Sequence, residues 1–286
     1  MILETYASAR EFLSATEAYR CSAPWTTNVM GSVATAVAEG QRHYDAYQWW
    51  SVREGDEVVL AAMRTSPLAV SCGPGPRAAA EILGQEVAEL CDDTPGLNGP
   101  EDVVGWTLDA YRRSDSPGSR RATRIDLRSV LYVCTEVIAP HVEGRARRAV
   151  AGDVEIVLAW LTAFADETSV PHTDEATIRR KIADDEILLW EVAGATVSLA
   201  GHATPVATPQ GVVTRVGPVY TPKNQRARGF AGAVTASLTQ SLLSQGSQVM
   251  LYADASNATS NGLYQRLGYR AVGTTVSLSF TTGSSA

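Results

Sequence analysis

The sequence predicts an α/β protein whose mixed sheet is divided between two domains. Its 286 residues exceed what one hydrophobic core usually organises. Hydrophobic residues make up 45% and charged residues 19%, which is the balance of an ordinary globular protein. In the second half of the chain, three strand-like segments in succession precede a strand–helix–strand pattern. This order favours antiparallel pairing first and parallel pairing later, and hence a mixed sheet.

Composition and motif spacing exclude several classes of protein. The formal net charge of −7 argues against a nucleic-acid partner, whose binding site is basic. Such a charge suits cationic partners such as amines, although solubility alone explains it more simply. The cysteines form no CxxC pair and the histidines no HExxH pattern, so we expect reduced thiols and no metal. The N-terminus shows no signal peptide, and the longest apolar stretch, residues 156–165, is too short to span a bilayer. We therefore expect a cytoplasmic protein without a membrane partner.

The first half of the chain alternates between helical and strand-like segments. We expect helices at residues 5–20, 27–42, 76–90 and 101–113, and strands at 47–53, 57–65, 67–72 and 121–138. The stretch 91–102 predicts a loop. Residues 140–153 are basic, aperiodic and punctuated by Pro and Gly, so they mark the domain boundary.

The second half follows a stricter order. We expect helices at residues 154–167, 174–184, 229–245 and 257–268, and strands at 187–194, 195–203, 212–220, 249–255 and 269–280. Thr173 or Asp174 predicts the N-cap of the second helix. The small, polar residues 281–286 predict a frayed tail.

A Gly217-Pro218 pair interrupts the β-branched strand at 212–220. Proline removes a ladder donor and glycine weakens pairing, so this strand does not pair fully on both sides there. An edge strand or a bulge explains the pair. So does a strand that parts from its neighbour and leaves backbone groups free for a ligand.

The turn Arg226-Ala-Arg-Gly-Phe-Ala231 opens the helix at 229–245. Its small residues allow an anion to approach the backbone, and the helix dipole favours negative charge at that end. Lys223, Arg226 and Arg228 add positive charge. Taken alone, the turn is explained more commonly as a solvated basic loop.

A third motif, Asp-Ala-Ser-Asn257 followed by Ser260-Asn-Gly-Leu-Tyr-Gln-Arg-Leu-Gly-Tyr269, completes the pattern. Asn257 suits a helix N-cap, and Tyr264 falls two turns further along on the same side. In isolation, Tyr264 is more often a partly buried core residue.

Together these three motifs resemble the GNAT superfamily of acyl-CoA N-acyltransferases, over about residues 145–280. The resemblance implies that the fourth and fifth strands of the C-terminal domain splay apart to admit the pantetheine arm. It implies transfer of an acetyl group from acetyl-CoA to the primary amine of a small molecule or an exposed amino group, by direct attack in a ternary complex. Tyr264 would protonate the leaving thiolate. The implied cofactor contacts are Pro218, Val219, Tyr220, Arg226, Ala227, Arg228, Gly229, Phe230, Ala231 and Asn257.

The general base is not marked by a motif. Many relatives carry a glutamate where this chain has Arg215, and an arginine cannot accept the proton. Four alternatives remain, each explained more commonly as a solvated charge or a cap than as a base: Glu167, Asp166, His172 and Asp254. We place Glu167 first because the loop between the first two helices of this family usually lines the acceptor site.

The first half also contains Gly73-Pro-Gly-Pro-Arg-Ala78, which matches the GxGxxA dinucleotide fingerprint, with Asp92 and Asp93 about 20 residues on. That acid should end a second strand, whereas residues 81–90 predict a helix, so a dehydrogenase is unsupported. We expect residues 1–140 to be a degenerate GNAT-like copy that walls the acceptor site, and residues 141–286 to bind acyl-CoA. A homodimer is compatible with this division. The competing hypothesis is a non-catalytic module that senses acyl-CoA or scaffolds partners.

Overall fold

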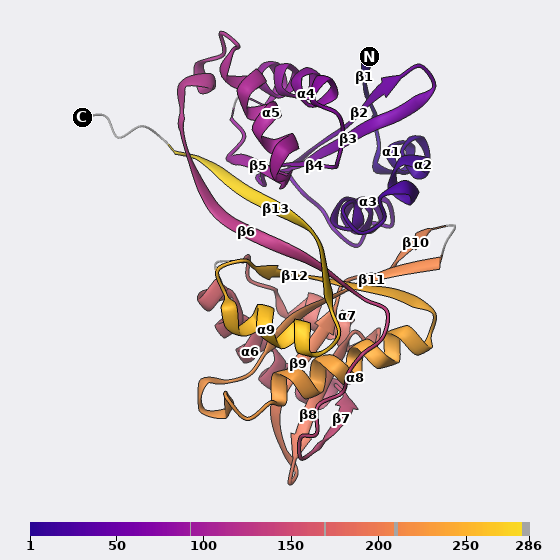
Figure 1. The fold of residues 1–286 in the computed structure, drawn as a ribbon, viewed down its shortest axis with the longest axis vertical. Coiled ribbons are helices and arrows are strands. Elements are labelled where there is room, and N and C mark those ends of the chain that lie inside the picture. The colour runs from indigo at the N-terminus through magenta and orange to yellow at the C-terminus, as the bar shows by residue number, and fades with distance from the viewer. Residues whose placement is uncertain (92, 169, 209–210, 282–286) are drawn as a thin grey trace, which may run out of the picture.

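The computed structural model describes residues 1–91, 93–168, 170–208 and 211–281 of the chain. Its two halves lie at opposite ends of an elongated molecule, and two long strands run between them (Figure 1). Of the tail expected at 281–286, Thr281 ends a strand. Residues 282–286, like Asp92, lie outside the described residues.

The two halves repeat one order of elements. The first half contains β1 (Ile2–Thr5), α1 (Ala9–Ala15), α2 (Glu17–Ser22), α3 (Asn28–Ala38), β2 (Ala46–Glu54), β3 (Glu57–Ser66), β4 (Val70–Cys72), α4 (Arg77–Leu90), β5 (Gly96–Pro100), α5 (Glu101–Arg112) and β6 (Ala122–Cys134). The second contains β7 (Arg145–Arg148), α6 (Val154–Thr168), α7 (Glu175–Ala183), β8 (Ile187–Val192), β9 (Ala195–His202), β10 (Val206–Thr208), β11 (Gly211–Tyr220), α8 (Phe230–Ser244), β12 (Ser247–Asp254), α9 (Ala258–Arg266) and β13 (Arg270–Thr281). With α1 and α2 counted together and β10 set aside, both halves run β-α-α-β-β-β-α-β-α-β.

The described strands form one thirteen-stranded sheet in the order β1-β2-β3-β4-β5-β13-β6-β12-β11-β9-β8-β7, with β10 beside β11. Each half gives its last strand to the other. Residues 129–134 of β6 pair with β12, and residues 275–279 of β13 pair with β5. Both strands cross the middle of the molecule side by side (Figure 1). A domain boundary near residue 140 stays a prediction, since β6 and β13 belong to both halves.

The sheet is mixed, as the sequence predicts. The pairs β4–β5 and β11–β12 are parallel, and each is connected through one helix, α4 or α8. The other pairs are antiparallel. The two parallel pairs occupy equivalent places in the two halves.

Helices cover both faces of the sheet in the second half. Because successive strand residues point to opposite faces, Leu189 packs in the core under α6 and α7, whereas Trp190 packs in the core under α8 and α9. Leu263 of α9 and Leu267, the C-cap of that helix, lie against Gly232 of α8, where a side chain would overlap Leu263. This close packing fixes the start of α8 relative to α9.

Three expectations about local structure are wrong. Residues 5–20 are not one helix: β1 precedes two short helices. The loop expected at 91–102 contains β5, whose Gly96 lies so close to β13 that a side chain would overlap the carbonyl oxygen of Leu278. The aperiodic stretch at 140–153 contains β7, an edge strand whose Arg145 and Arg147 pair with Glu191 of β8. In each case tertiary pairing overrides weak local propensity.

Candidate functional site

The parallel strands β11 and β12 stop pairing partway along their length. Their pairing runs from Val212–Ser247 to Arg215–Met250 and then stops. Beyond that point β11 pairs only with β9, and β12 only with β6. A bulge between Val216 and Val219 places the extra residue of β11 at the Gly217-Pro218 pair. The structure thus confirms the splay between the fourth and fifth strands of this half, counted without β10.

The N-terminus of α8 lies just beyond the splay and presents free donors. Gly229, the N-cap, has φ +82°, and Ala227 has φ +62°. A side chain at Gly229 would come within 2.9 Å of Val142. Within the described residues, the N–H groups of residues 227–232 donate to no acceptor. A turn of this kind is a ready site for an anion.

The basic side chains of the turn are partly neutralised by Glu167 of α6. Arg226 donates to Glu167 at 2.6 Å and to the Thr221 carbonyl at 2.9 Å, and Lys223 lies 3.9 Å from the same carboxylate. Arg226 therefore holds the pKa of Glu167 below its usual range. Arg228 stays clear of the ion pair, with its guanidinium 4.6 Å from the Phe230 ring centroid.

These contacts bear on the proposed role of Glu167. A carboxylate whose pKa is lowered by an arginine is a weaker proton acceptor. Glu167 also lines neither of the two cavities described below. Its assignment as the general base stays a prediction. In the structure, Glu167 contacts Arg226 and Lys223 at the turn before α8.

Tyr264 is held by α9, whose N-cap is Asn257: the Asn257 side chain accepts a hydrogen bond from Ser260 N at 2.9 Å. The Tyr264 ring lies among aromatic neighbours, with ring centroids 6.3 Å from Tyr132 and 5.8 Å from Tyr269. Burial raises the pKa of Tyr264 to about 12. Its hydroxyl bonds to no group in the described part of the chain, so it is a protonated, unengaged donor at neutral pH.

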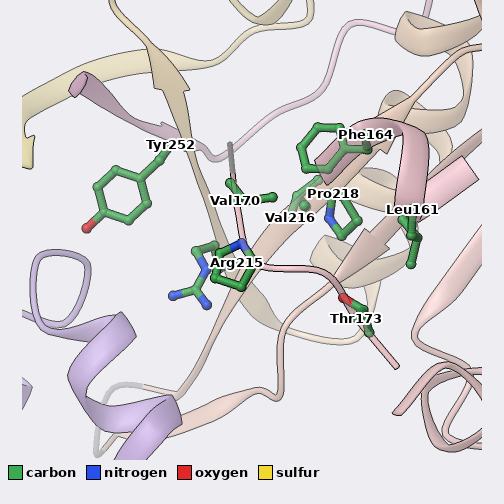
Figure 2. A pocket seen from close by; sticks show the side chains of 10 residues that line it. Leu161, Phe164, Val170, Thr173, Arg215, Val216, Pro218 and Tyr252 are labelled. Atoms are coloured by element: carbon green, nitrogen blue, oxygen red, sulfur yellow. The ribbon is translucent and has the colours of Figure 1, made fainter. Parts of the chain in front are cut away.

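Two adjoining cavities open at the splay, with volumes of about 290 and 720 Å³. Arg215, Gly217 and Pro218 line both. Figure 2 shows the smaller cavity, where Leu161, Phe164 and Pro218 form an apolar side and Arg215 lies opposite. The larger cavity runs between the two halves: α3 and residues 41–44 and 67–68 line it from the first half, and residues 170–174 and α7 from the second.

Of the four alternative bases, His172 is the one that lines a cavity in the described structure. Its Nε2 lies 3.2 Å from Asp166 Oδ1, so a carboxylate orients the imidazole. Asp254 instead accepts bonds from the Ser256 N–H and hydroxyl and stabilises a turn. Asp174 caps α7, as predicted, by accepting from Thr177 N at 2.7 Å.

The sequence leads us to expect that the first half walls the acceptor site, but it does not indicate which of its residues do so. Asn28 of α3 accepts a hydrogen bond from Arg215 Nη1 at 3.2 Å, across 187 positions of sequence. Trp25 donates to Gln248 at 3.2 Å. No local pattern marks Asn28, Trp25 or Arg42 as neighbours of the splay, since only the tertiary fold brings them there.

The equivalent turn of the first half, Gly73 to Pro76, is closed. The Tyr19 hydroxyl donates to the Pro74 carbonyl at 2.6 Å, and Gly73 N donates to the Ala61 carbonyl at 2.8 Å. A side chain at Gly75 would overlap Val59 and Leu60 of β3. These glycines allow the turn to pack tightly on the sheet rather than to approach a phosphate. Asp93 is engaged by Arg64 at 2.7 Å.

Comparison with known proteins agrees with this geometry. Residues 197–278 match the family model described as FR47-like protein. The chain superposes on an acetyltransferase of the GNAT family from Colwellia psychrerythraea with a TM-score of 0.62 at 12% identity, covering 98% of this chain and 100% of that one. A Drosophila protein gives 0.66 at 15% identity, with 99% of each chain covered. A tandem GNAT protein from the clavulanic acid biosynthesis pathway gives 0.58 at 13% identity, covering 99% of this chain and 100% of that one. No curated protein matches.

The resemblance to the GNAT superfamily, and its tandem form, is therefore confirmed for the fold. Within the described residues no group of three or more His, Cys, Asp or Glu side chains is placed to hold a metal ion. No described helix is long and apolar enough to cross a bilayer.

Proposed function

We propose that this protein is a cytoplasmic N-acyltransferase that transfers an acetyl group from acetyl-CoA to a primary amine by direct attack. The observation that carries the proposal is the splay of β11 from β12, which leads directly to the free amides at the N-terminus of α8. A thioester with a phosphorylated tail fits both features at once. The four cysteines are free thiols, in keeping with a reducing compartment.

The residues at the splay fit the cofactor. The N–H groups of residues 227–232, with Arg228 and Lys223 beside them, would hold the pyrophosphate. The bulged edge of β11 at Pro218, Val219 and Tyr220 has no strand partner on the β12 side, so its backbone groups would line the pantetheine arm. Asn257, at the start of α9, would contact the same arm. Bound acetyl-CoA supplies the activated acyl group.

Two side chains handle protons in this proposal. The amine must be neutral to attack, and an alkyl amine has a pKa of about 10. His172 lines the larger cavity and is oriented by Asp166 through Nε2, so its other ring nitrogen, Nδ1, would accept the proton. Tyr264, which burial keeps protonated, would donate to the departing thiolate.

A second hypothesis has one observation in its favour. A thiol has a pKa near ~8.5, so a tyrosine with a pKa of about 12 is a weak acid toward its thiolate. This favours a non-catalytic protein that binds acyl-CoA as a sensor or scaffold. The two hypotheses share the cofactor site and differ in turnover.

Isothermal titration with acetyl-CoA and a thiol-release assay over a panel of amines distinguish them. We expect micromolar binding, amine-dependent thiol release, and a loss of kcat of about 100-fold in Tyr264→Phe with unchanged binding. Binding without turnover, indifferent to Tyr264→Phe, would leave only the sensor. Absence of binding would sink both hypotheses.

A further inference from the structure

The larger cavity is strongly basic, although the protein as a whole carries a net charge of −7. Four permanently or normally cationic side chains line it, against one carboxylate, Asp174. The cations come from both halves: Arg42, Arg180, Lys181 and Arg215. A cavity wall of one sign concentrates ligands of the opposite sign.

Two of these cations, Arg180 and Lys181, are already neutralised by a glutamate that does not line the cavity. Glu186, only 4% exposed, lies 2.6 Å from Lys181 and 3.7 Å from Arg180. The other two are not. Within the described residues, neither Arg42 nor Arg215 has a carboxylate within 4.0 Å. Arg215 donates to Asn28 Oδ1 at 3.2 Å, and Arg42 to the Tyr44 hydroxyl at 3.4 Å.

Arg215 is the less usual of the two because it is largely enclosed. Burial lowers its pKa, and the charge of Arg42 lowers it further. An enclosed guanidinium without a counter-charge is unfavourable, and its planar fork of donors matches a carboxylate. The Asn28 contact occupies one donor and fixes the side chain, which leaves the remaining donors for a ligand.

The position of Arg215 ties such a ligand to the splay. It is the last residue of β11 that pairs with β12, two residues before Gly217-Pro218. In Figure 2 its guanidinium extends away from the apolar side of the smaller cavity formed by Phe164 and Pro218. A carboxylate held there leaves an amine on the same small molecule within reach of the parted strands.

We propose that the acceptor is an amino carboxylate, whose carboxylate binds Arg215 and Arg42 while its amino group is acylated. This inference rests on the proposed function. In the reaction the amine nitrogen bonds to the acyl carbon and the C–S bond breaks. Of the two protons that the ammonium loses, one passes to solvent through the base and one ends on the thiol.

A carboxylate on the acyl group of the donor would satisfy the same guanidinium, so the source must be tested. The acceptor is favoured because Arg42 and other residues of the first half line this cavity, whereas no residue of the turn at 226–231 does. The positive charge of the cavity wall also lowers the pKa of an acceptor amine bound there, and so favours the neutral form that attacks the thioester.

The test compares α-, β- and ω-amino carboxylates with their own carboxamides in the thiol-release assay with acetyl-CoA. We expect kcat/KM for the preferred amino carboxylate to exceed that of its carboxamide by about 30-fold or more, as removal of a buried charge pair predicts. Arg215→Gln should reduce the ratio to about threefold or less, and the exposed variant Arg42→Gln should reduce it by about fivefold. Arg179→Gln, a variant of an exposed arginine of α7 that lines neither cavity, is the matched control and should leave the ratio unchanged.

Two further measurements make every outcome decisive. Succinyl-CoA is compared with acetyl-CoA, using hexylamine as acceptor: if Arg215→Gln changes only this donor preference, the carboxylate belongs to the donor and the inference is overturned. Isothermal titration of 6-aminohexanoate and its carboxamide does not depend on turnover. Carboxylate binding that requires Arg215 supports the inference even when no thiol is released, which would count against the proposed function alone. Equal binding and equal turnover of the two ligands overturn the inference.

Discussion

The two halves of this protein share one topology and differ at one turn. In the second half, the turn before α8 has free amides and positive φ angles at Ala227 and Gly229. In the first half, the turn before α4 packs on β3, and the Tyr19 hydroxyl bonds to its backbone. The difference shows that the fold provides the place for a site, while a few residues in one turn decide whether that place is open.

We expect the largest difference between the two turns when a glycine in each is replaced by valine. Gly229→Val should weaken acetyl-CoA binding by about 100-fold, because a β-branched residue at φ +82° and against Val142 displaces several charge-assisted donors. Gly75→Val should leave binding intact and destabilise the fold, since its side chain meets β3. Titration calorimetry and thermal unfolding measure the two effects. Gly246→Val, at φ +81° beyond the other end of α8 with open space around it, is the matched control for backbone strain. Equal losses of binding in all three variants would contradict the claim that only the turn before α8 binds the cofactor.

The general base gives the next largest effect. His172→Gln should lower kcat/KM by about 100-fold at neutral pH, as loss of a positioned base predicts. Glu167→Gln should change kcat by no more than about threefold, because Glu167 pairs with Arg226 and a pKa below the usual range suits it poorly to accept a proton. Steady-state kinetics with saturating acetyl-CoA decide between them. The reverse ranking would restore Glu167 as the base.

A pair of tyrosines separates structure from chemistry. Tyr19→Phe removes the bond to the Pro74 carbonyl and should lower the free energy of unfolding by about 1 kcal/mol without affecting thiol release. Tyr264→Phe removes a hydroxyl that has no partner in the described structure, so stability should be retained while kcat falls. Chemical denaturation and kinetics on the same samples provide both readouts. Loss of stability in Tyr264→Phe would show that its hydroxyl has a structural partner.

The last prediction concerns the edge of the second half, where we expect an effect on stability alone. Asp153 accepts from both terminal nitrogens of Arg147, at 2.7 and 2.8 Å, which lowers the pKa of the carboxyl. A depressed folded-state pKa adds stability that is present above the unfolded value, near ~3.9, and is lost as pH falls through the folded value. Asp153→Asn should therefore destabilise the protein by about 1–3 kcal/mol at pH 7, with the difference vanishing at strongly acidic pH. Arg145→Gln, which removes an exposed pair with Glu191, should have an effect below about 1 kcal/mol. A difference independent of pH would rule out the ion pair as its cause.

The sequence predicted the C-terminal half well because its signals are local. Gly217-Pro218 breaks a strand, Gly229 starts a helix, and Asn257 caps another, so each is visible within a few residues. The first half was predicted less completely. Strand β5 contains two glycines and a proline, and only its fit against Leu278 of β13 explains why it is a strand.

The acceptor side of the site was the least predictable part. The sequence shows only that Arg215 cannot act as a base, whereas its surroundings depend on Asn28 and Arg42, which lie far away in sequence. The resemblance favours Glu167 as the base because the loop between the first two helices of the family usually lines the acceptor site, but the structure pairs Glu167 with Arg226. Local sequence shows residue type and periodicity. It does not show which charges a tertiary contact has already neutralised.

The exchange of last strands between the halves has a consequence for the order of folding. During synthesis the first half emerges complete except for β13, which lies at residues 270–281 and is the last element to appear. Until then the edge of β5 that faces β13 is unpaired, and β6 has at most one of its two neighbours, β12. Open strand edges invite intermolecular pairing, and contacts between ends of a chain form slowly. The nascent first half therefore exposes unpaired strand edges until β13 has been synthesised, and intermolecular pairing competes with folding during that interval.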